Sequence, residues 1–176
     1  STKRSGEMYQ AKKIAIGFLG VGILLGNFEG QSFAALQPTH TWNDGMEHKE
    51  EGISGDDFWL SINHATTLEG NVTVEPDGTG QVSGTAGSVW KGSLEVGKQA
   101  WGRVKFTNNS TWTGDYTFKD ESSTGDVMVE DGSTWTGGAN IVDGGFLIRL
   151  HSSAWIGSLE TNGLTRDISA SIGGSS

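Results

Sequence analysis

A five-residue phrase, Ser-x-Trp-x-Gly, occurs four times in this chain of 176 residues. The copies occupy 88–92, 110–114, 133–137 and 153–157, so successive tryptophans are 22, 23 and 20 residues apart. Periods of roughly 20 to 50 residues are typical of solenoids, in which each repeat buries its apolar face against the next. This repeat restricts the possible folds more than any other feature of the sequence.

Apolar and polar residues alternate on both sides of each tryptophan. After the second tryptophan, every other position is Gly114, Tyr116 and Phe118, and polar residues lie between them. Before it, Val104 and Phe106 have the same spacing. A period of two predicts strands with one buried face. Each repeat is therefore expected to contain two or three short strands.

Turn-forming residues separate the two strands of each repeat. They are Asn108–Asn109, Asp131–Gly132 and His151–Ser152. Turn residues of this kind tolerate left-handed or otherwise strained backbone. We expect them to form the corners between strands, and the last corner to be one residue shorter than the others.

The repeat predicts an all-β fold, a right-handed parallel β-helix with coils of 20–23 residues. Successive coils would stack at a spacing of roughly 4.8 Å. The glycine is expected to leave room for the neighbouring indole ring, and the serine to hydrogen-bond the adjacent turn. An antiparallel β-sandwich or meander is the alternative, with Asp77–Gly78 and Asp131–Gly132 as hairpin turns.

Residues 1–34 have the pattern of a signal peptide. Their first part has four basic residues against one acidic residue, and an apolar run over 14–25 follows. As a helix this run would be about 18 Å long, short of the roughly 30 Å hydrocarbon core of a membrane. Small residues at Ser32 and Ala34 place the expected cleavage before Ala35. A retained membrane anchor or a buried helix is the alternative.

The rest of the chain divides by composition. Residues 35–80 are acidic and lack the repeated phrase, and we expect them to form an N-terminal cap that prevents end-to-end stacking. Residues 81–176 contain the β-helix repeats and end in mid-pattern. We therefore expect the repeats to continue in a longer parent chain.

The charge of the chain restricts its partners. The net charge is −9, and without the 4 basic and 2 acidic residues of the first 34 it becomes −11. Such a charge disfavours nucleic acid and anionic membrane surfaces, which require a basic face. The chain has no cysteine, which excludes a disulfide framework. We expect an exported, secreted or cell-surface protein whose mature part is not embedded in a membrane.

No residue pattern indicates a metal site. The four histidines do not have the spacing of metal ligands such as HExxH. His48 lies among Glu47, Glu50 and Glu51, and we expect a solvated acidic loop there. The stretch 77–80 lacks the alternating acids and the closing Glu of a calcium loop, and it is interpreted as a turn.

No residue pattern indicates catalysis either. Glu95 and Glu160 are expected at equivalent outward positions, but three coils apart. That separation, roughly 14 Å at strand spacing, exceeds what a pair of glycosidase carboxylates requires. The arginines Arg103, Arg149 and Arg166 do not share one phase of the repeat. We predict no catalytic, cofactor-binding or metal-binding residue, no cofactor, and a non-enzymatic protein.

The tryptophans could in principle form a row that stacks on sugar rings. Their phase argues against this, because Trp90, Trp112, Trp135 and Trp155 share a face with the apolar positions Leu94, Tyr116, Val96 and Phe118. We therefore expect a buried ladder of indoles. A carbohydrate-binding β domain that uses exposed tryptophan is the main functional alternative.

The phrase Ser-x-Trp-x-Gly, followed by alternating apolar residues and by Asp-Gly or Asn-Asn turns, resembles the passenger domains of Gram-negative autotransporters. These are the pertactin-like right-handed β-helices, and the stretch Ser133 to Asn140 is especially similar to their repeats. The resemblance covers roughly residues 81–176 and the signal-like segment. It implies a surface-exposed or secreted adhesin-type protein with a protein or glycan ligand that the sequence does not identify. A polysaccharide-acting β-helix enzyme is a further alternative.

Overall fold

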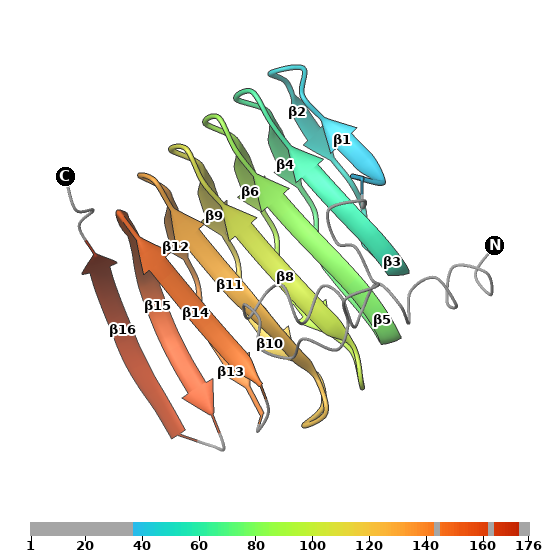
Figure 1. The fold of residues 1–176 in the computed structure, drawn as a ribbon, viewed down its shortest axis with the longest axis vertical. Coiled ribbons are helices and arrows are strands. Elements are labelled where there is room, and N and C mark those ends of the chain that lie inside the picture. The colour runs from blue at the N-terminus through green and yellow to red at the C-terminus, as the bar shows by residue number, and fades with distance from the viewer. Residues whose placement is uncertain (1–36, 143–144, 162–163, 173–176) are drawn as a thin grey trace, which may run out of the picture.

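The structure, a computed structural model, describes residues 37–142, 145–161 and 164–172. Across these residues the protein is an all-β parallel solenoid of about five turns, in which 15 strands are parallel and no helix occurs. Successive turns stack from β1 and β2 at one end to β16 at the other (Figure 1). The predicted parallel β-helix is confirmed, and the antiparallel sandwich is wrong. In the described part of the chain, no helix has the length and apolarity needed to cross a membrane.

Each turn contributes strands to three ladders. The first ladder contains β1 (His40–Trp42), β3 (Ile53–Ile62), β5 (Val72–Gly84), β8 (Trp101–Phe106), β11 (Thr124–Glu130) and β14 (Phe146–His151). The second ladder carries the tryptophans and consists of β2 (Glu47–Lys49), β4 (Thr67–Glu69), β6 (Val89–Lys91), β9 (Thr111–Thr113), β12 (Thr134–Thr136) and the first half of β15 (Ser153–Thr161).

The third ladder closes the turn. It joins the first halves of β3 and β5 to β7 (Leu94–Val96), β10 (Tyr116–Phe118), β13 (Ala139–Ile141) and the second half of β15. The final strand, β16 (Leu164–Ile172), pairs antiparallel with β15 over its whole length. This hairpin is the one antiparallel pairing among the described strands, and it covers the last edge of the second and third ladders (Figure 1).

The parallel ladders extend into the acidic segment. Leu68 pairs with Trp90 and occupies the tryptophan position of its turn, and His48 pairs with Leu68 one turn earlier. The boundary expected at residue 81 therefore coincides with no break in the strand pairing. The capping role expected for residues 35–80 stays a prediction, and the signal peptide over 1–34 lies outside the described residues.

The corners between the first and second ladders have left-handed backbone. Two consecutive residues have positive φ in the corners that follow β3, β5, β8 and β11: His64–Ala65, Ala86–Gly87, Asn108–Asn109 and Asp131–Gly132. The corner that follows β1 has one such residue, Gly45. In the last corner only Ser152 has positive φ, at 50°, and His151 belongs to β14. The expected corners are confirmed at Asn108–Asn109 and Asp131–Gly132, and the shorter last corner needs one left-handed residue instead of two.

The repeated tryptophans form a continuous stack inside the solenoid. Ring centroids of consecutive indoles lie 5.2, 4.7 and 4.6 Å apart, with interplanar angles of 4–7°. Each indole Nε1 donates a hydrogen bond to a backbone carbonyl of the preceding turn. For Trp112 the acceptor is the Gly92 carbonyl at 2.7 Å, and for Trp135 it is the Gly114 carbonyl at 2.8 Å. Each indole ring is therefore buried, and its N–H still has a hydrogen-bond acceptor.

The glycine of each phrase is required by this contact rather than by the neighbouring ring alone. A Cβ at Gly114 would lie 1.8 Å from the Gly92 carbonyl oxygen and 3.1 Å from Nε1 of Trp112. The same collision with the preceding glycine, at 1.7–1.9 Å, would occur at Gly92, Gly137 and Gly157. Backbone cannot move away from such a contact without breaking the strand ladder, so any side chain at this position is excluded.

The serine of each phrase forms a second polar row beside the indole stack. Ser88 donates its backbone N–H to Oγ of Ser110 at 3.2 Å, and Ser110 donates likewise to Oγ of Ser133 at 3.0 Å. Ser110 Oγ in turn donates to the Thr107 carbonyl at 2.8 Å. All three serines are buried. The expected bond from the serine to the adjacent turn is confirmed, and it satisfies backbone groups that the corner would otherwise leave unpaired.

Replacing Gly114 by alanine tests this close contact. We expect the free energy of unfolding to fall by at least the roughly 1–3 kcal/mol typical of overpacking, because the new Cβ meets backbone of the preceding turn. Thr113→Ala is the matched control, since Thr113 is the exposed residue directly before Gly114, at the end of β9. Urea titrations of both variants measure the difference. Equal losses would contradict the inward assignment of Gly114.

Candidate functional site

The repeated tryptophans are unavailable to a ligand. Trp90, Trp112 and Trp135 have no exposed surface, and Trp155 is 5% exposed. Trp112 and Trp135 have an indole of a neighbouring turn on each ring face, and their N–H groups are bonded to the preceding turn. The carbohydrate platform considered for these four residues is therefore wrong, and the buried ladder is confirmed. A binding site must lie on an outer face of the solenoid.

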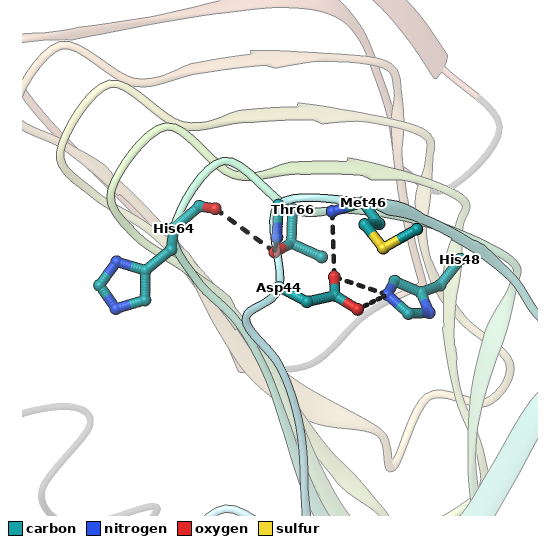
Figure 2. Close-up of polar contacts among 6 residues, drawn as sticks. Asp44, Met46, His48, His64 and Thr66 are labelled. Atoms are coloured by element: carbon teal, nitrogen blue, oxygen red, sulfur yellow. Dashed lines mark hydrogen bonds and ion pairs between the residues drawn. The ribbon is translucent and has the colours of Figure 1, made fainter.

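The loop expected around His48 is wrong at Glu47–Lys49, because these residues form the strand β2. His48 also has a side-chain partner close by in the sequence. His48 Nε2 lies 2.9 and 3.0 Å from the two carboxylate oxygens of Asp44, and the same carboxylate accepts the backbone N–H of Met46 at 3.0 Å. Figure 2 shows these contacts beside the corner at His64 and Thr66. The bond from His48, followed by the one from Met46, lowers the pKa of Asp44 below its ordinary value. The arrangement closes an exposed turn at the first coil.

The other charged residues considered as candidates from the sequence lie apart from one another. Glu95 and Glu160 occupy one outward row of the third ladder, separated by Thr117 and Asn140. They are three turns apart, as expected. No group of three or more His, Asp or Glu side chains among the described residues is arranged to hold a metal ion. Arg103 instead pairs with an acidic residue on the next turn.

The outer face of the first ladder carries a pocket of about 350 Å³. It spans three turns, β3, β5 and β8, and it is lined by Trp59, Ser61, Asn63, Gln81, Ser83, Gly84, Thr85, Arg103, Lys105 and Thr107. Nine of these ten residues have polar groups in the side chain, and none is a carboxylate. A concave site with a few convergent polar groups and an aromatic ring has the general character of a ligand site.

Two interactions fix the side chains of this pocket. Trp59 donates its indole N–H to Oγ of Ser83 on the next turn at 2.8 Å. Arg103 forms a bidentate pair with Asp126, with Nε–Oδ1 at 2.7 Å and Nη2–Oδ2 at 2.9 Å. The guanidinium also lies over the ring of Trp101, 5.1 Å from its centroid. Charge-assisted bidentate pairs are geometrically specific, so one wall of the pocket is held in place.

Sequence reasoning did not find this pocket. Its residues come from three turns: partners in the strand register are 22 positions apart, and the bonded pair Trp59 and Ser83 is 24 apart. Serine, threonine and asparagine are common throughout the chain, so their types gave no signal. The available signal was incomplete: Trp42, Trp59 and Trp101 all lie outside the repeated phrase, and of the three only Trp59 is not buried.

No family model, curated protein or solved structure matches the chain. Its function must therefore be inferred from its own residues and their geometry.

Truncation of a central indole tests the structural role of the ladder. We expect Trp112→Ala to reduce the free energy of unfolding by about 3–5 kcal/mol, the range for loss of a buried aromatic side chain. Thr111→Ala, on the half-buried side of the same strand, is the control. Indole fluorescence should be blue-shifted and weakly quenched by acrylamide in the native protein. Retention of full stability by Trp112→Ala, with loss of glycan binding, would contradict the ladder interpretation.

Removal of His48 tests the turn at Asp44. In His48→Ala the pKa of Asp44 should rise toward its ordinary value, because the largest cause of its lowering is lost. A lowered carboxyl pKa contributes stability above the unfolded pKa, and that stability is lost as pH falls through the folded pKa. Carbon-detected NMR titration measures the shift. Asp120, whose pKa is lowered by hydrogen bonds from Ser122, is the internal control and should not change.

Proposed function

We propose that the chain is a non-enzymatic segment of an extracellular or cell-surface β-solenoid, of the type found in adhesin-like autotransporter passengers. One observation carries the proposal: every part of the repeated phrase is used inside the solenoid. The indoles stack, the glycines accept their N–H groups, and the serines bond the corners. The repeated residues form the interior of a rod-like solenoid. The phrase does not determine the residues of the outer faces.

Two features of the sequence support export. The first 34 residues have the pattern of a signal peptide, and the chain has no cysteine. A protein without disulfides can remain unfolded while it crosses a second membrane. The net charge of −9 favours solubility outside the cell.

The rod-like fold supports a projecting role. In a solenoid each turn contacts only its neighbours, so length is added by adding turns. The exposed row Lys91, Thr113, Thr136 and Ile156 of the second ladder contains one charged, two polar and one apolar side chain. A scaffold of this kind displays a surface at a distance from its point of attachment, which is the property an adhesin requires.

Export is tested by expressing the full chain, preceded by a start codon, in a Gram-negative host. We expect a mature N-terminus at or near Ala35, read by mass spectrometry of the periplasmic or secreted form. Ala34→Leu, which replaces the small residue before the cleavage point, should block processing. Leu36→Ala, which lies beyond the cleavage point, is the control and should be processed normally. Recovery of the protein with residues 12–25 attached would contradict the signal peptide and favour an anchor.

A further inference from the structure

We infer that the pocket on the outer face of β3, β5 and β8 binds a saccharide that carries a carboxylate. The inference deepens the proposed extracellular role, because it names the class of ligand that the outer face would meet. It depends on four observations: an oriented indole, a set of uncharged hydrogen-bonding side chains, a lysine without an ion pair among the described residues, and the size of the pocket.

The indole of Trp59 is outside the core and oriented. Trp59 is half-buried, it lies on the outer face, and its N–H is held by Ser83 of the next turn. Aromatic rings supply a large apolar contact at low cost in conformational entropy, and Trp combines it with a polar edge. Sugars have apolar C–H faces that pack on such rings. The hydrogen bond to Ser83 keeps the ring in one orientation before a ligand arrives.

Uncharged polar groups surround the ring. Asn63 and Gln81 carry amide groups, each with a carbonyl acceptor and an NH₂ donor. Three hydroxyls beside them use part of their capacity within the protein: Ser61 donates to Asn63 at 3.3 Å, Thr107 donates to Asp131 at 3.0 Å, and Thr85 accepts from Asn108 at 3.0 Å. Because a hydroxyl can both donate and accept, each keeps one role for a ligand. Sugar hydroxyls also donate and accept, so this mixture matches a polyhydroxylated ligand better than it matches a purely anionic or apolar one. Discrimination against ligands without hydroxyls follows, because unpaired polar groups in a pocket are costly.

Lys105 supplies the preference for an anion. The charge of Arg103 is matched by Asp126 within 2.9 Å, whereas no ion pair involving Lys105 is present among the described residues. The residues that pair with Lys105 across the ladder are Ser83 and Met128, and neither is charged. Because Asp126 matches the charge of Arg103, Lys105 supplies the net positive charge of a lining that contains no carboxylate. A carboxylate beside Lys105 would complete the charge balance.

The size of the pocket sets the length of the ligand. About 350 Å³ is close to the lower end of the roughly 300–1,000 Å³ of small-molecule sites. The three turns that form the floor extend over roughly 10 Å at strand spacing. This space suits a short saccharide unit, which could belong to a longer polymer lying along the face.

Isothermal titration calorimetry on the purified full chain tests the inference with three disaccharides. Cellobiose is the neutral probe, cellobiouronic acid differs from it by one carboxylate, and a monosulfated cellobiose tests charge without a carboxylate. We expect the carboxylated probe to bind about tenfold more tightly than cellobiose, the factor that one charge-assisted hydrogen bond provides. In Lys105→Gln this preference should disappear while the affinity for cellobiose stays the same.

Two further variants define the site. Lys91→Gln removes an exposed lysine from the second ladder, and it should leave all three affinities unchanged. Trp59→Ala should weaken cellobiose and cellobiouronic acid alike, with near-UV circular dichroism confirming that the buried indole stack is intact.

Several results would overturn the inference. They are the absence of saccharide binding at millimolar concentration, equal affinity for the neutral and carboxylated probes, tighter binding of the sulfated probe than of the carboxylated one, or equal effects of the Lys105 and Lys91 substitutions. None of these measurements involves export. Failure of saccharide binding would therefore leave the proposed surface scaffold standing, and failure of signal processing would leave the pocket standing.

Discussion

The hydrogen bond from each indole N–H to a glycine carbonyl of the preceding turn is the interaction on which the solenoid depends. It joins two requirements that usually conflict, since a large aromatic ring must be buried and its polar N–H must be satisfied. The glycine meets both requirements. Its carbonyl oxygen lies within 2.7–2.9 Å of the indole Nε1, and the absence of a Cβ lets the backbones of adjacent turns approach this closely. One residue pair thereby fixes the spacing, the register and the burial of adjacent turns.

This interior separates structure from function along every strand. Inward positions form ladders of indoles, aliphatic side chains and aromatic rings, and Tyr116 donates its hydroxyl to the Gly102 carbonyl at 2.7 Å within the core. Burial raises the pKa of Tyr116 well above its ordinary value, so it remains a neutral donor. Outward positions have no such constraint. A ligand site can therefore change on one face without any change in the repeat that supports it.

The ladder, the corners and the turn length could be predicted because each depends on residues within one repeat. The first turns could not, since Leu68 and His48 replace tryptophan and remove the phrase while the strand pairing continues. Backbone pairing in a parallel ladder does not depend on side-chain identity, so a turn persists where the phrase is lost. The pocket escaped prediction for a related reason: Trp59, Gln81 and Lys105 meet only when three turns are stacked, and no spacing within one turn marks them.

The buried pair of Arg103 and Asp126 has a role in register rather than in overall stability. Burying two charges costs free energy that their attraction offsets only partly, so such a pair is weak evidence for added stability. Its position is informative, because the two residues face each other between β8 and β11, 23 residues apart, where the preceding turn has a 22-residue spacing. An extra residue at a corner could be accommodated by slipping the strand, which would turn every side chain to the opposite face. A slipped strand would leave both charges buried and unpaired, so the pair penalises the wrong register and keeps one wall of the pocket aligned with the indole ladder behind it.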